Sequence, residues 1–154
     1  MSKLYMFFAT GFYSGLAPKA PGTAGSLFAA ILLFASTSFV PDLVTTYSLL
    51  GVIALFFVIG VFTTNHLEET LGKDPGCIVI DEFVGMWISL LFLPLQWWTI
   101  ALGFVLFRFF DILKPFFIGT IDQKVKGGLG VMLDDVLAGI YANICLQLIV
   151  RYFI

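Results

Sequence analysis

The sequence predicts an all-α fold, a polytopic membrane bundle of about five embedded helices, some of them short, with the polar motifs on one side. Of the 154 residues, 60% are hydrophobic and 12% are charged, whereas soluble domains carry about 25% charged residues. Several stretches long enough to cross a bilayer contain no ionisable side chain. The length allows one domain, so residues 1–154 are expected to form a single membrane-embedded unit.

Charge-free stretches predict three spans. Residues 24–41 and residues 43–65 lack ionisable side chains and are each long enough for a membrane helix. Pro41 and Asp42 between them are typical of a tight turn, so these two helices are expected to form a hairpin. Residues 136–150 form the last predicted span, which is of marginal length.

The stretch over residues 83–107 has two interpretations, one long span or two short helices broken near Pro94. We favour two helices, because proline removes a helix hydrogen bond and Trp97 and Trp98 are typical of a membrane–water boundary. A helix over 83–93 is too short to cross alone. It must therefore be tilted, buried by protein or extended towards the N-terminus.

Two hairpins would bring the segments near Pro21, Asp81, Lys114 and Asp134 to one side of the membrane. The lysines on that side are Lys19, Lys73, Lys114, Lys124 and Lys126. Positive charge marks the cytoplasmic side, so we expect a multi-pass protein of the cell membrane with its polar site facing the cytoplasm. If residues 83–107 formed one span, the acids would be divided between two sides and no shared site could form.

The rest of the composition excludes several classes of protein. With 8 Lys and Arg against 10 Asp and Glu, the net charge is −2, and no basic surface is available to bind nucleic acid. Cys77 and Cys145 lie far apart and His66 is the only histidine, so neither a zinc site nor a disulfide framework is predicted. A Ser–His or Cys–His catalytic pair has no support either.

The first polar motif is Ala-Pro-Gly-Thr-Ala-Gly-Ser at residues 20–26, which leads directly into an apolar helix. Thr23 or Ser26 could cap this helix, and the backbone N–H groups beside Gly22 and Gly25 would form a binding site for phosphate. Taken alone, the motif is better explained as the ordinary start of a transmembrane helix.

Two acid pairs are each expected at the start of an apolar helix on the same side. Asp81 and Glu82 interrupt a hydrophobic run, and Gly85 one turn later leaves a bare patch for a ligand or another helix. Asp134 and Asp135 follow a glycine-rich segment, which we expect to be a loop that delivers both acids to the last helix. Ordinary interfacial acids and a capped flexible loop are the alternative interpretations.

A third polar cluster consists of Arg108, Asp111 and Lys114, which are spaced three residues apart and share one helix face. One interpretation is a row of ion pairs that lets the end of the helix lie at the membrane surface, where Pro115 ends the helix. The other is a phosphate site, in which the arginine supplies a planar fork for phosphate oxygens. The segment alone leaves both open.

Carboxylate oxygens are the protein ligands that Mg²⁺ prefers, with water and substrate phosphate completing its shell. The candidates for metal binding and catalysis are Asp81, Glu82, Asp111, Asp134 and Asp135. The candidates for phosphate binding are Arg108, Lys114, Gly22, Thr23, Gly25 and Ser26. The pattern does not assign separate roles to the acids as metal ligand, base or nucleophile.

Four ordered motifs give the sequence a family resemblance over residues 11–139. They are PGTAGS at 21–26, IVIDEFVGMW at 78–87, FRFFDILKP at 107–115 and GGLGVMLDDVLAG at 127–139. In their order and spacing the chain resembles the phosphatidylglycerophosphatase A family, bacterial membrane enzymes that remove the terminal phosphate from phosphatidylglycerophosphate.

The resemblance implies a Mg²⁺-dependent lipid phosphatase of the bacterial inner membrane that produces phosphatidylglycerol and inorganic phosphate in phospholipid biosynthesis. It places the family's acidic positions on the five acids above and its basic positions on Arg108 and Lys114. In the expected mechanism, carboxylates hold Mg²⁺, the cations neutralise the phosphate and a metal-bound water attacks phosphorus. A first attack by an aspartate, which would form a phospho-enzyme, stays open.

Two other functions are alternatives. A small membrane transporter or channel subunit with an acidic ion site would have its acids near mid-span, whereas these acids cluster at predicted helix starts. A CDP-alcohol phosphotransferase would carry a DG-AR-G-D-D pattern, which this sequence lacks. The sequence specifies neither the oligomeric state, the acyl-chain preference nor the number of metal ions.

Overall fold

The computed structural model describes residues 3–72 and 75–153, with only the backbone of Asp122 and Phe153. Every regular element within these residues is helical, which confirms the predicted all-α class. Three helices are long and apolar enough to cross a membrane: α2 (Pro21–Phe39), α3 (Thr46–Leu71) and α7 (Gly127–Phe153). The chain is therefore a membrane protein.

The first two long helices are joined at the predicted turn, but they do not pack against one another as a hairpin; each packs mainly against other helices of the bundle. A short 3₁₀ helix, η2 (Pro41–Leu43), joins α2 to α3 at the expected turn. Thr45 caps α3, because its hydroxyl accepts a hydrogen bond from the Ser48 backbone N–H while its own N–H donates to the Ser48 hydroxyl. α3 continues beyond Asn65, where the charge-free run ends, as far as Leu71.

The ambiguous stretch forms two helices, as we favoured. α4 (Ile80–Ile88) and α5 (Trp97–Leu113) are separated by residues 89–96, which contain Pro94. The short α4 is accommodated by burial within the protein, one of the three possibilities above. It packs against α2, α3, α5 and α7, and most of its side chains are buried. Non-helical backbone at membrane depth is tolerated when protein covers it.

The last helix begins earlier than predicted. Residues 127–135, expected as a glycine-rich loop, are the first part of α7, so Asp134 and Asp135 lie about two turns inside the helix rather than at its start. The glycines permit close packing instead of a turn. A Cβ on Gly128 would collide with the Val61 carbonyl of α3, which is the use of small residues expected between membrane helices.

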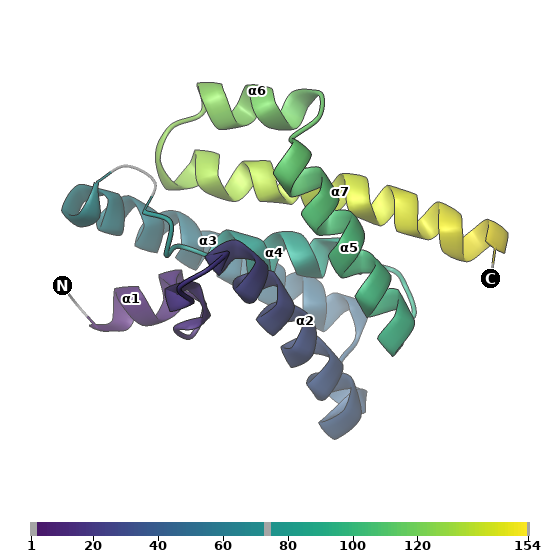
Figure 1. Cartoon of the computed structure of the whole chain (residues 1–154). Helices are drawn as coiled ribbons and strands as arrows, with labels where there is room; N and C mark the ends of the chain where they lie inside the picture. The colour runs from purple at the N-terminus through teal and green to yellow at the C-terminus, as the bar shows by residue number, and fades with distance from the viewer. Residues whose placement is uncertain (1–2, 73–74, 154) are drawn as a thin grey trace.

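α4 lies at the centre of the bundle, with α3 and α7 on either side and α2 and α5 crossing in front (Figure 1). The shorter helices α1 (Lys3–Ala9) and α6 (Phe117–Lys124) lie against α3 and α7 respectively, and η1 (Ser14–Leu16) precedes α2. Aromatic packing fixes α4, because the fully buried Phe83 ring contacts Phe12, Phe28, Phe56 and Trp87. This packing sets the position of the acids in the first turn of α4.

Candidate functional site

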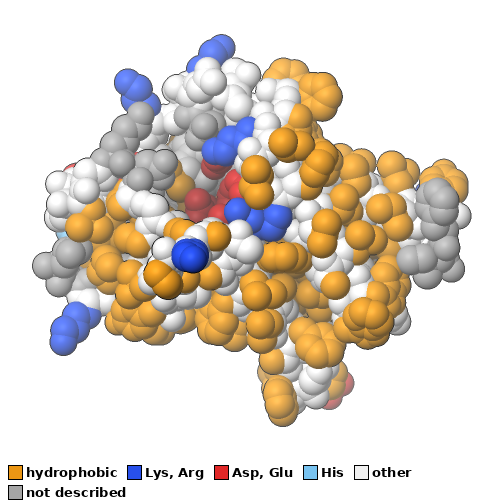
Figure 2. All heavy atoms as spheres, viewed as in Figure 1, with side chains coloured by type: hydrophobic (Ala, Val, Ile, Leu, Met, Phe, Trp, Pro, Cys, Tyr) orange, Lys and Arg blue, Asp and Glu red, His pale blue; other side chains and the backbone are white. Residues whose placement is uncertain are grey.

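A charged hollow lies where the first turns of α2 and α4 meet the end of α5 and the first half of α7. Figure 2 shows acidic side chains inside this hollow, Lys and Arg around it and hydrophobic side chains over much of the remaining face. The charge of Asp135 interacts with those of all four other candidate acids, and Asp81 interacts with Glu82, Asp111 and Asp134 as well. The structure therefore brings the five predicted acids from three helices into one site.

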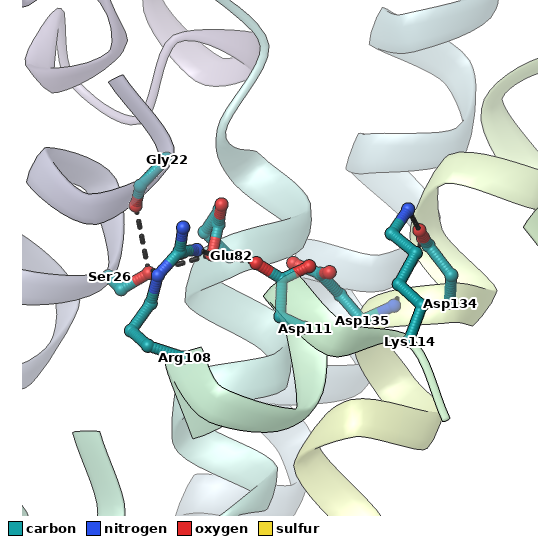
Figure 3. A network of polar contacts seen from close by, with 8 residues as sticks. All are labelled: Gly22, Ser26, Glu82, Arg108, Asp111, Lys114, Asp134 and Asp135. Atoms are coloured by element: carbon teal, nitrogen blue, oxygen red, sulfur yellow. Dashed lines mark hydrogen bonds and ion pairs between the residues drawn. The ribbon is translucent and has the colours of Figure 1, made fainter. Parts of the chain in front are cut away.

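Arg108 is the central cation of the hollow. Its Nη1 atom lies 2.5 Å from Glu82 Oε2 on α4 and 2.8 Å from Asp111 Oδ2 one turn along α5 (Figure 3). The contacts of Arg108 with the described residues all use Nη1, while its Nε atom is buried without a hydrogen-bond partner among them. The Nε–H group is therefore a donor that the described residues leave unsatisfied.

Ser26 supports this ion pair from α2. Its buried hydroxyl lies 2.7 Å from Glu82 Oε2 and 2.8 Å from the Gly22 carbonyl, so its single proton is shared between these two acceptors. The expected cap by Thr23 or Ser26 is wrong, because Ala20 in the left-handed region is the N-cap and Pro21 begins the helix. Ser26 lies one turn further in and faces α4.

The two glycines of the first motif differ in their surroundings. A Cβ on Gly22 would collide with Glu82 Oε1 and lie 3.4 Å from Arg108 Nη1, so this glycine borders the charged hollow. A Cβ on Gly25 would lie 2.7 Å from the Val79 side chain, so this glycine lets α2 pack against the segment before α4. Thr23 is half-buried in the first turn of α2.

Lys114 provides a second ion pair at the other side of the hollow, with its Nζ atom 2.6 Å from Asp134 Oδ2 (Figure 3). The prediction that Arg108, Asp111 and Lys114 share one helix face is correct for Arg108 and Asp111 only. Lys114 is the C-cap of α5, with a φ of 44°, because Pro115 prevents the helix from continuing. Between the two ion pairs, the carboxylates of Asp111 and Asp135 point toward one another (Figure 3).

Gly85 accommodates a helix rather than a ligand. A Cβ on it would lie 2.7 Å from the Asp135 carbonyl, and a Cβ on Gly139 would lie 2.5 Å from the Gly85 carbonyl. α4 and α7 thus approach through their backbones, as small residues allow in membrane proteins. This contact is what places Asp135 beside the acids of α4.

Two oxygens of the hollow suit a divalent cation. Asp81 Oδ1 and Asp135 Oδ2 are buried without a hydrogen-bond partner among the described residues, and buried carboxylate oxygens are normally satisfied. No three described Asp, Glu, His or Cys side chains form a ready-made metal group, but Mg²⁺ is usually held by only one or two carboxylates with water and phosphate. The two residues therefore fit Mg²⁺ as partial ligands.

Two asparagines support the site and were missed in the sequence. Asn143 of α7 donates to the carbonyls of Ser89 at 3.0 Å and Leu91 at 2.9 Å, which satisfies the backbone where α4 ends. Asn65 of α3 accepts a hydrogen bond of 2.7 Å from the Gly128 N–H at the start of α7. A polar residue within an apolar run, as Asn143 is in residues 136–150, was the available signal.

The family model described as Phosphatidylglycerophosphatase A matches residues 7–150. Curated proteins named Phosphatidylglycerophosphatase A are similar: that of Escherichia coli is 45% identical, covering 91% of this chain and 80% of the relative, and that of Haemophilus influenzae is 47% identical, covering 88% and 82%.

A third similar protein carries a different name. It is a Bacteroides thetaiotaomicron protein provisionally named as a phosphatidylinositol-3-phosphatase, which is 42% identical over 93% of this chain and 91% of the relative. No solved structure matches the chain.

Proposed function

The chain belongs to the phosphatidylglycerophosphatase A family, and we propose that it hydrolyses phosphatidylglycerophosphate to phosphatidylglycerol and inorganic phosphate in phospholipid biosynthesis. The family makes the chain a phosphatase, which sets aside the transporter, channel and phosphotransferase alternatives. One observation supports the substrate class best. A guanidinium whose buried Nε has no partner and two buried carboxylate oxygens without partners among the described residues belong to one cluster of charges, at a hollow in the surface of an apolar bundle.

In this proposal Arg108 binds the terminal phosphate. Glu82 and Asp111 hold Nη1 and so fix the plane of the guanidinium, while Ser26 holds Glu82. The Nε edge then donates to phosphate oxygens in a bidentate contact. Lys114, on the other side of the carboxylates, adds positive charge that neutralises the same phosphate.

Asp81 and Asp135 would hold Mg²⁺, which when bound supplies Lewis-acid stabilisation of the charge on the phosphoryl group. The ligand roles of Glu82, Asp111 and Asp134 stay predictions, and the ion pairs with Arg108 and Lys114 favour orienting roles for them. A carboxylate of the hollow takes the proton of the attacking water as its oxygen bonds to phosphorus. The bond from phosphorus to the glycerol oxygen breaks, and that oxygen takes up a proton to become the hydroxyl of phosphatidylglycerol. If an aspartate attacks first, rapid quenching with phosphate-labelled substrate should trap a labelled protein.

Phosphate release in detergent tests the proposal. Purified protein with Mg²⁺ is expected to release phosphate from phosphatidylglycerophosphate with a higher kcat/KM than from phosphatidylinositol-3-phosphate or phosphatidic acid, and chelation should abolish the release. The phosphatidylinositol-3-phosphate arm is included because one similar protein bears that name. A preference for the inositol lipid would reassign the substrate, and release from none of the three lipids would contradict the proposal.

We further propose that the chain lies in the bacterial inner membrane with the hollow facing the cytoplasm, and labelling of single cysteines tests this. With Cys77 and Cys145 replaced by serine, Gln96→Cys should react from outside the membrane and Lys126→Cys from the cytoplasm. Lys126 is a better labelling position than the neighbouring Gly127, because Lys126 is exposed whereas the φ of 72° at Gly127 disfavours a residue with a side chain. Reaction of both cysteines from the same side would contradict the orientation. Lys73 and Asp74, which we also predict inside, lie outside the described residues.

A further inference from the structure

An apolar groove of about 350 Å³ begins beside the charged hollow, between α2 and α5. Its walls contain no charged side chain. The residues that matter here are Leu27, Ile31 and Phe34 on α2, and Ala101, Phe104 and Val105 on α5. In Figure 2, hydrophobic side chains continue from the hollow over this part of the molecule.

The groove and the charged hollow share two helix faces. On α5, Ala101, Phe104 and Arg108 are spaced at three and four residues, so they lie in one row. On α2, Ser26 directly precedes Leu27 and lies one turn before Ala30, which also lines the groove. One end of the groove is therefore next to the Arg108–Ser26 contact, where Nη1 lies 3.4 Å from the serine hydroxyl.

Large apolar side chains along the groove are left uncovered by protein. Ile31 is 54% exposed, Phe34 45% and Val105 59%. From Trp97 at one end to Arg108 the α5 wall is about 16 Å long, at 1.5 Å per residue. This length is close to half of the roughly 30 Å hydrocarbon core, which is about the length of one extended acyl chain.

We propose that this groove binds one acyl chain of the lipid whose phosphate contacts Arg108. The inference rests on the proposed function and adds a second binding site for the same substrate. A lipid phosphate held at Arg108 fixes where its acyl chains begin, and the groove is an apolar surface that starts one turn away along α5, at Phe104. The groove between α2 and α3 is lined by Leu33, Val44, Leu49 and their neighbours, none of which lies in the hollow.

A bulky residue in the groove should separate binding of the acyl chain from phosphate chemistry. Ala101 is exposed, so Ala101→Phe would fill the groove without disturbing the core. We expect this variant to raise the KM for long-chain phosphatidylglycerophosphate about tenfold. The kcat for a short-chain analogue should stay at the wild-type value, because that analogue does not reach Ala101.

Ala54→Phe is the matched control, because Ala54 is exposed on α3 and lines neither of these grooves. It should leave both substrates unaffected. If the wild-type protein hydrolyses both substrates and Ala101→Phe keeps the wild-type ratio of their kcat/KM values, the groove assignment is wrong. If the wild-type protein hydrolyses neither, the proposed function itself fails. A change of oligomeric state in Ala101→Phe alone would instead make this face a contact between copies and overturn the assignment.

Photolabelling provides a readout that is independent of turnover. A phosphatidylglycerophosphate analogue with a photoreactive group in the middle of one acyl chain should label peptides of α2 and α5 that contain Ile31 and Phe104. A phosphatidylcholine analogue with the same group lacks the terminal phosphate and should label the lipid-exposed helices without this preference. Equal labelling patterns for the two lipids would contradict the proposal.

Discussion

Asp135→Asn and Asp81→Asn are each expected to lower the turnover of phosphate release by about a thousandfold or more at saturating Mg²⁺. Each substitution keeps the shape of the side chain but removes the negative charge. It can place an amide group where the wild-type protein has a buried carboxylate oxygen without a partner among the described residues. Such an oxygen is a good ligand for a hard cation, and the amide binds it more weakly. Steady-state kinetics with a Mg²⁺ titration measures the loss.

Binding of Mg²⁺ can be followed without activity. A ligand that binds only the folded protein raises its thermal stability, so Mg²⁺ should raise the Tm of the wild-type protein and raise it less in either variant. The variants should still accumulate in the membrane, because removing one of several neighbouring carboxylates relieves repulsion between like charges.

Asp42→Asn is the matched control for both aspartate variants, since Asp42 is exposed in η2, after the opposite end of α2 from the hollow. It should keep wild-type turnover and the wild-type Tm shift. Near-normal turnover of both Asp81→Asn and Asp135→Asn at saturating Mg²⁺ would show that the metal and catalytic residues are wrongly assigned.

Much of the bundle could be predicted because a membrane constrains the sequence directly. Lipid offers no hydrogen bonds to the backbone, and a helix satisfies its own backbone groups, so long runs without charge predicted both α2 and α3. Pro94 and the tryptophans after it predicted the break between α4 and α5. That break brings the acids of α4 to the same hollow as Asp135, and a single span would have separated them.

The errors come from tertiary contacts that one sequence does not contain. Glycines favour turns in isolation, but Gly128 and Gly139 lie in α7, where the neighbouring backbones of α3 and α4 require residues without a Cβ. Lys114 was placed on the face of Arg108 by its spacing, yet the end of α5 directs it to Asp134. The support of the α4 end by Asn143 depends on a helix more than fifty residues later in the chain.

Arg108→Lys is expected to lower kcat/KM by about a hundredfold or more. A lysine ammonium could still pair with Glu82 or Asp111, but it has no planar edge that donates two parallel hydrogen bonds to phosphate. Arg151→Lys is the control, because Arg151 is exposed near the end of α7 beside the Tyr152 ring and should tolerate the change. Steady-state kinetics on phosphatidylglycerophosphate compares the two variants.

The kinetic parameter that changes identifies what the guanidinium does. A loss in kcat would mean that the guanidinium binds the phosphate more strongly as negative charge develops in the transition state. A higher KM alone would mean that it binds the headgroup only in the ground state.

Glu82→Gln separates phosphate binding from organisation of the acids. It removes the charge opposite Nη1 and should lower activity less than Arg108→Lys, because the Nε edge remains. Wild-type kinetics in Arg108→Lys would assign Arg108 to holding the carboxylates, and Lys114 with the backbone of residues 22–26 would then have to bind the phosphate.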